Sequence, residues 1–142
     1  MLSPITAALT PGLKGEVSAV VTDAMTGPVV GSGLVVVLAT PAMVALMEGA
    51  AVNCVEHLLP PGYNTVGTEL EVSHTKPTPP GVSVTARAEL LEVDGRKLTF
   101  RIEARDVLEV IGHSTHTRVV VDRPRFDAKV AAKLAAAQTL RK

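Results

Sequence analysis

Aromatic residues are almost absent from this chain of 142 residues, and it has a single cysteine. Tyr63, Phe100 and Phe126 are the only aromatics, and 14 Lys and Arg residues balance 14 Asp and Glu residues. Without a basic stripe or a platform for stacking bases, the sequence does not predict nucleic-acid binding. Cys54 cannot form a disulfide within the chain, which favours a reducing compartment, so we expect a cytoplasmic protein.

Charged residues are also missing between Asp23 and Glu48, a gap long enough to raise the question of a membrane helix. This stretch is interrupted by Pro28, Gly31, Gly33 and the Thr40-Pro41 step. Proline directly after threonine is typical of the start of a helix. We therefore expect a loop, a short extended segment and the beginning of a buried helix, with no membrane partner.

One carboxylate lies in the middle of the most apolar helical segment, which we predict at about 41 to 58. At 3.6 residues per turn, Glu48 falls on the same side as Val44 and Val55. Burying an unpaired carboxylate is costly, so such a group is kept for a partner or for a function. His74, at the end of the next strand-like segment, could be that partner, and an ion pair with Arg118 is the structural alternative.

The remaining segments alternate apolar and polar residues, as antiparallel strands with one buried face do. A tight hairpin is predicted at Asp94-Gly95, and an Ala-rich helix is predicted to open at Asp127 and run to about residue 140. The length fits one domain, residues 1 to 142. The expected strands cover residues 15 to 22, 82 to 90, 98 to 105 and 110 to 121.

A long helix that is apolar over most of its surface needs more cover than one flat sheet face gives. A curved antiparallel sheet wrapped around that helix meets this requirement. The sequence thus predicts an α+β hotdog fold, with the C-terminal helix added to it.

Several short motifs between residues about 39 and 121 resemble the fluoroacetyl-CoA thioesterase family, a family of hotdog thioesterases. They are Ala39-Thr40, Leu46-Met47-Glu48, Gly67-Thr68, His74-Thr75, Thr78-Pro79-Pro80-Gly81 and Gly112-His113-Ser114-Thr115-His116. The resemblance implies an acyl-CoA thioesterase acting on short-chain or small substituted acyl groups.

By the same resemblance, Thr40, Glu48 and His74 form the catalytic group. Thioester hydrolysis needs a nucleophile or an activated water, a proton shuttle and donors for the oxyanion. His74 suits the shuttle, and Glu48 suits either attack on the carbonyl or activation of water. Backbone N–H groups at Gly67 and Thr68 are candidates for substrate contact, as is Arg118. No metal and no cofactor are expected, because coenzyme A is part of the substrate.

Other interpretations of the same residues stay open. Thr40 before Pro41 has the pattern of a helix N-cap, and His74 could be an ordinary histidine at a strand end. His113 and His116, three apart on a strand, should project to opposite faces and not share a metal. The alternative functions are a noncatalytic acyl-CoA-binding or scaffold domain and a hotdog enoyl-CoA hydratase.

Two further expectations concern assembly and selectivity. The resemblance implies a homodimer with active sites at the interface, which would also cover an open sheet edge. The resembled enzyme that is specific for fluoroacetate has aromatic residues forming a hydrophobic lid just ahead of its catalytic threonine. Residues 25 to 39 here contain none, so we expect modest discrimination among short acyl groups.

Overall fold

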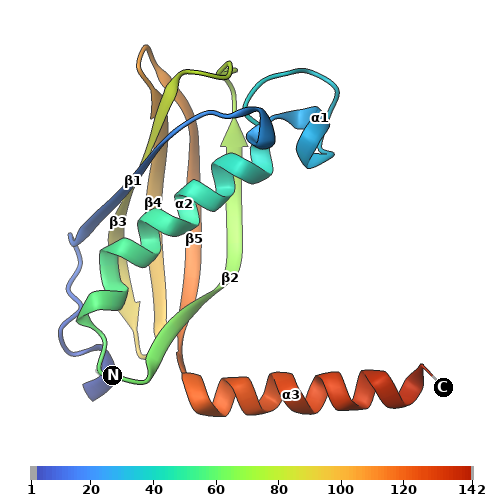
Figure 1. The fold of residues 1–142 in the computed structure, drawn as a ribbon. Helices are drawn as coiled ribbons and strands as arrows, with labels where there is room; N and C mark the ends of the chain where they lie inside the picture. The colour runs from blue at the N-terminus through green and yellow to red at the C-terminus, as the bar shows by residue number, and fades with distance from the viewer. Residues whose placement is uncertain (1–2, 142) are drawn as a thin grey trace.

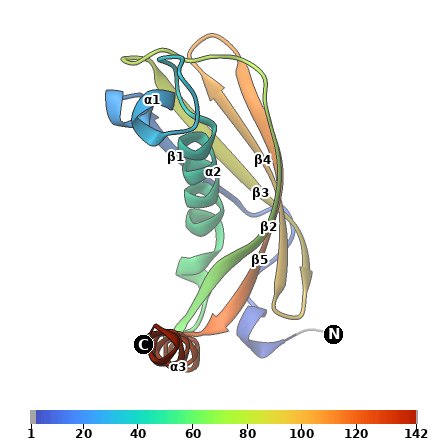
Figure 2. The same cartoon turned by 90° about the vertical axis from the view of Figure 1, so that its right-hand side faces the viewer.

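The computed structural model describes residues 3 to 141 and shows a five-stranded antiparallel sheet curled around a helix (Figures 1 and 2). The strand order is β1-β3-β4-β5-β2, so β1 and β2 are the two edges. The predicted α+β architecture, a sheet wrapped around a long helix, is confirmed. The strands are β1 (Lys14–Val20), β2 (Tyr63–His74), β3 (Ser83–Asp94), β4 (Lys97–Asp106) and β5 (Val110–Asp122).

Helix α2 (Thr40–Val55) crosses the concave face of the sheet diagonally, from the end of β2, beside Thr40, toward the start of β1, beside Cys54 (Figure 1). A 3-10 turn, η3 (Glu56–Leu58), extends it to the predicted end of the central helical segment, and Pro60 and Pro61 follow. The other helical elements are η1 (Pro4–Thr6), η2 (Asp23–Met25), α1 (Gly27–Val30) and α3 (Arg123–Leu140). Among residues 3 to 141, no helix combines the length and the apolar character needed to cross a bilayer.

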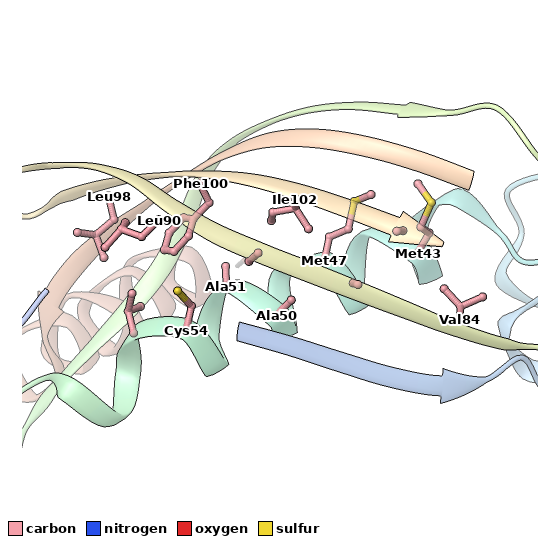
Figure 3. Packing of buried hydrophobic residues seen from close by; sticks show 14 of the residues in the cluster. Met43, Met47, Ala50, Ala51, Cys54, Val84, Leu90, Leu98, Phe100 and Ile102 are labelled. Carbon is pink, nitrogen blue, oxygen red and sulfur yellow. The ribbon is translucent and has the colours of Figure 1, made fainter. Parts of the chain in front are cut away.

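The core lies between one side of α2 and the inner faces of β3, β4 and β5 (Figure 3). Phe100 is fully buried there, beside aliphatic residues of the same strands. Each such side chain contributes roughly 1.5 to 3 kcal/mol when it is removed from water. The buried residues of α2 are Met43, Met47, Ala50, Ala51, Cys54 and Val55.

Helix α2 rests directly on the backbone of β1, at Gly15. A Cβ atom added to Gly15 would lie 2.5 Å from the carbonyl oxygen of Ala50 and closer still to the amide nitrogen of Cys54. Backbone atoms cannot rotate away as the end of a side chain can. The missing side chain of Gly15 therefore sets how near the central helix lies to the edge strand.

Gly15→Ala should lower the free energy of unfolding by about 1 to 3 kcal/mol, the usual cost of overpacking a core. Urea denaturation measures this change. Gly33→Ala is the matched control, because a Cβ atom there would meet nothing within 4 Å, and we expect it to leave stability nearly unchanged. Equal stability of the two variants would show that α2 does not rest on β1 as described.

The predicted hairpin is confirmed, and the start of the C-terminal helix is corrected. Asp94 pairs with Lys97, and Gly95 takes the positive φ of 61° that a two-residue turn requires. Helix α3 begins at Arg123, four residues before Asp127. Asp122 is its N-cap and accepts a hydrogen bond from the backbone N–H of Arg125. The N-cap pattern at residue 122 is the signal that the prediction overlooked.

Candidate active site

Thr40 and His74 meet where the first turn of α2 approaches the end of β2. The hydroxyl oxygen of Thr40 lies 2.8 Å from Nδ1 of His74. The N-cap of α2 is Ala39, and Thr40 is the first helical residue, so the capping interpretation of Thr40 is wrong. Its hydroxyl holds the imidazole ring instead.

His74 is half-buried, and its Nε2 is buried with no hydrogen-bond partner among the described residues. Burial lowers the pKa of the His74 imidazole below its ordinary value, and the nearby backbone of Lys76 opposes this in part. The ring is therefore neutral at pH 7 and can take up a proton. A buried nitrogen without a hydrogen-bond partner lowers the stability of the fold by roughly 1 to 3 kcal/mol. Such unsatisfied groups need an explanation, and a catalytic role is one.

A cleft of about 310 Å³ opens beside this pair. Thr40, His74 and the turn after His74 form one wall, and the segment of residues 27 to 39 forms the other. Leu34 and Val35 of that segment are 93% and 70% exposed. The cleft is thus bordered by aliphatic side chains that nothing in the described chain covers.

Glu48 forms an ion pair with Arg118, with Oε2 lying 3.4 Å from Nη1. The Glu48 side chain is 44% exposed, whereas that of Arg118 is only 7% exposed. The prediction of a buried carboxylate is therefore wrong, because α2 buries the side that carries Met43 and Met47 and leaves Glu48 at its border. His74, the expected partner of Glu48, bonds Thr40 within this chain.

Arg118 is fixed by a cluster of buried polar groups that the sequence analysis missed. Its Nε donates to the hydroxyl of Thr65 at 2.8 Å, and its Nη2 donates to the carbonyl of Thr65 at 3.1 Å. Its Nη1 lies 3.1 Å from Nε2 of His116. Alternation along β5 places residues 116 and 118 on the same face and could have indicated the cluster.

His116 is a neutral acceptor in this cluster. Its Nδ1 lies 2.8 Å from the carbonyl oxygen of Glu69, so Nδ1 carries the proton and Nε2 accepts from Arg118. Burial lowers the pKa of His116, and the nearby Arg118 cation lowers it further, against the hydrogen bond to Glu69. His116 is buried and His113 is exposed, so the expected opposite directions of the two rings are confirmed.

Gly67 lets Glu48 approach β2. A Cβ atom at Gly67 would lie 2.9 Å from Oε2 of Glu48 and 3.0 Å from Cε1 of His116. The register of β2 against β5 shifts between Gly67 and Glu69, and the hydroxyl of Thr68 at this bulge donates to the carbonyl of Thr117 at 3.3 Å. Such bulges are common beside active sites.

Within one copy, the candidate residues form two separate groups. Thr40 and Glu48 are eight residues apart on α2, which is about 12 Å along the axis and roughly 80° around it. Thr40 and His74 form the first group, and Glu48, Gly67 and Arg118 form the second. Among residues 3 to 141, no three His, Cys, Asp or Glu side chains gather as metal ligands would.

Comparisons with known proteins point to one enzyme family. The model of the fluoroacetyl-CoA-specific thioesterase family matches residues 21 to 124. The fluoroacetyl-CoA thioesterase of Streptantibioticus cattleyicolor is 46% identical over 97 residues, which cover 68% of this chain and 70% of that protein.

Solved structures agree with this match. A fluoroacetyl-CoA thioesterase structure is 37% identical, with a TM-score of 0.83 over 88% of this chain and 97% of the other. A mutant of such an enzyme in complex with acetyl-CoA gives the same identity and TM-score, over 88% and 98%. A hot-dog-like protein from Thermanaerovibrio acidaminovorans is 23% identical, with a TM-score of 0.83 over 92% and 97%, and supports the fold alone.

Proposed function

Because the chain belongs to the fluoroacetyl-CoA-specific thioesterase family, we propose that it hydrolyses small acyl-CoA thioesters at the cleft beside Thr40 and His74. It is a thioester hydrolase. Water adds to the carbonyl carbon, the carbon–sulfur bond breaks, and the leaving thiolate of coenzyme A takes up a proton. The reaction uses no further cofactor, because coenzyme A arrives as part of the substrate. The observation that carries the site assignment is the 2.8 Å contact of Thr40 with a neutral, half-buried His74.

Each proposed residue has one task. His74 moves the proton between the attacking water and the leaving sulfur, since a neutral imidazole can accept it and an imidazolium can return it. Thr40 holds the ring in place. Glu48 supplies the negative charge. It either attacks the carbonyl carbon and expels the thiolate, after which water activated by His74 cleaves the resulting anhydride, or it holds the attacking water by a hydrogen bond while His74 takes the proton. The backbone N–H groups at Gly67 and Thr68 are the proposed oxyanion donors, and Arg118 positions Glu48 on the substrate side.

We propose that these groups meet across a homodimer. Glu48 contacts β2 at Gly67, before its middle, whereas His74 ends the strand. Strand β2 has one edge without a neighbour among the described strands. In an antiparallel pair of β2 strands, the end of one strand lies beside the first half of the other. Glu48 of one copy then approaches the Thr40 and His74 pair of the second.

A free thiol at Cys54 fits the cytoplasm, where we expect the enzyme.

Acetyl-CoA and fluoroacetyl-CoA should both be hydrolysed, with kcat/KM values that differ by roughly 10 to 200-fold at most. A hydrophobic pocket separates close analogues by only ~1 to 3 kcal/mol, and residues 25 to 39 contain no aromatic side chain to make it more selective. Release of the coenzyme A thiol from a panel of acyl-CoA substrates measures these values. A preference of several orders of magnitude for fluoroacetyl-CoA would contradict this expectation.

The same panel tests the proposed function against its alternatives. A noncatalytic acyl-CoA-binding domain would bind the panel and release no thiol. A hydratase would convert an enoyl-CoA to the hydroxyacyl-CoA and leave the thioester intact. Either result would overturn the proposal.

A further inference from the structure

Helix α3 has an apolar stripe that the described residues leave largely uncovered. None of its 18 residues is buried. Among its large apolar side chains, Val130 and Leu134 are 53% and 58% exposed, and Phe126 is partly exposed. These three residues recur every four positions and so lie along one side of the helix. We call Phe126, Val130 and Leu134 the α3 stripe. A helix of this length gains most of its stability by packing such a face against another element, and the described part of this chain provides none.

The position of α3 shows where that other element would lie. The helix leaves the end of β5 and runs out past the β2 edge, across the direction of the strands (Figure 1). Figure 2 shows it end-on, on the side of the sheet that carries α2. Its 18 residues span about 27 Å. The helix therefore occupies the space beside β2, where the second copy of the proposed dimer would pair.

Strand register fixes which end of the second copy α3 would meet. Asp122, the N-cap of α3, pairs with Tyr63 at the start of β2, whereas His74 is the last residue of β2. In an antiparallel pair of β2 strands, the start of one strand lies beside the end of the other. The α3 helix of one copy thus extends toward the Thr40 and His74 end of its partner.

That end carries an exposed apolar surface of its own. We call residues 27 to 39 the cleft segment, because it borders the cleft beside Thr40 and His74. Five aliphatic side chains of this segment are between 41% and 93% exposed, an unusual density for a surface. They are Val29, Val30, Leu34, Val35 and Val36.

Charge also favours a second copy of this chain as the partner. Residues 123 to 142 contain six Lys or Arg and one Asp, whereas residues 1 to 122 contain eight Lys or Arg and 13 Asp or Glu. The helix and the rest of the chain therefore carry net charges of opposite sign, which attract one another between copies.

The family match ends at residue 124, so nearly all of α3 lies outside the region that defines the family.

We propose that α3 packs across the cleft segment of a second copy, so that each cleft is covered by a helix of the partner. The proposal rests on the proposed function through the dimer that both share. The α3 stripe would close the open aliphatic side of the cleft and exclude water from the acyl group. Selectivity would then depend in part on residues of the partner.

Thiol crosslinking tests this contact directly. In the variant Leu34→Cys/Leu134→Cys, a short bismaleimide should join two chains and give a band near twice 14.8 kDa on a denaturing gel. The matched control is Leu34→Cys/Ala132→Cys, because Ala132 lies on the opposite side of α3 and should give little of that band. The native Cys54 should stay unreactive, since the residue is buried and burial raises the pKa of its thiol.

The outcomes separate failure of this contact from failure of the proposed function. Light scattering and acetyl-CoA hydrolysis are measured on the unmodified protein. Suppose that the unmodified protein is an active dimer. If the crosslink between chains then fails to form, forms within one chain, or forms to the same extent in the control variant, the α3 contact is wrong and the proposed function stands. A monomeric protein would overturn the α3 contact together with the shared site, and an inactive dimer with the expected crosslink would overturn the function alone.

A basic helix with an apolar stripe could bind a lipid surface instead. Sedimentation with anionic phospholipid vesicles tests this case. The test variant, Val130→Glu/Leu134→Glu, places two negative charges on the α3 stripe. The control variant, Ala132→Glu/Ala135→Glu, places the same charges on the opposite side of α3. If only the test variant loses vesicle binding and the crosslink between chains does not form, α3 binds a membrane surface and the proposal is overturned. The proposal is supported if the crosslink forms and the vesicles either do not bind the protein or bind both variants equally weakly.

Discussion

Glu48→Gln should reduce kcat for acetyl-CoA hydrolysis by about two orders of magnitude or more, the usual scale for loss of an acid-base group. Glutamine keeps the size of the side chain but removes the negative charge that attack or water activation needs. The loss should appear mainly in kcat, because the proposed role of Glu48 is in the chemical step.

Stability should change little in the same variant. Glu48 is 44% exposed, and Arg118 keeps its hydrogen bonds to Thr65 and its contact with His116. Glu92→Gln, at an exposed position of β3, is the control for the change of charge and should keep full activity. If Glu48→Gln unfolds the protein or retains wild-type kcat, Glu48 has a structural role and is not catalytic.

His74→Ala should cause a loss of similar size and should change the pH profile. Hydrolysis by the unmodified enzyme should rise with pH as His74 loses its proton, because only the neutral ring can accept one. Burial lowers the pKa of His74, so this rise should be complete at a lower pH than the ordinary value of about 6.5 would give. The dependence of kcat/KM on pH measures it, and the alanine variant should lack that rise.

His113→Ala is the matched control, since His113 is exposed on the outer face of β5. It should keep both the rate and the pH profile. The losses in Glu48→Gln and His74→Ala should not add in the double variant, because the two residues would act as one unit. An unchanged profile in His74→Ala would exclude His74 as the proton shuttle.

Much of the fold could be predicted because its signals are local. Alternation of apolar and polar residues indicated β3, β4 and β5, and Asp94-Gly95 indicated the hairpin between the first two. The apolar segment that ends before Pro60 indicated the central helix. The start of α3 was misplaced because two acidic residues, Asp122 and Asp127, both have the pattern of a helix start, and only the preceding strand shows which one caps the helix.

The site was less predictable, because its geometry depends on contacts between distant segments. Helix α2 is apolar on most sides, so its sequence does not show which side faces the sheet, and Glu48 was assigned to the wrong environment. Thr40 has the local pattern of a cap, but the approach of β2 gives it His74 as a partner. The Arg118 cluster needs β2 and β5 in register, which a single strand pattern does not specify.

Mixing two inactive variants tests the central claim, a catalytic site shared between two copies. Glu48→Gln and His74→Ala homodimers are combined, unfolded, refolded together and assayed with acetyl-CoA. A mixed dimer holds one site with Thr40 and His74 from one chain and Glu48 from the other. Random exchange makes half of the dimers mixed, so we predict about a quarter of the wild-type activity. Activity that stays at the level of the separate variants, although mixed dimers form, would contradict the shared site.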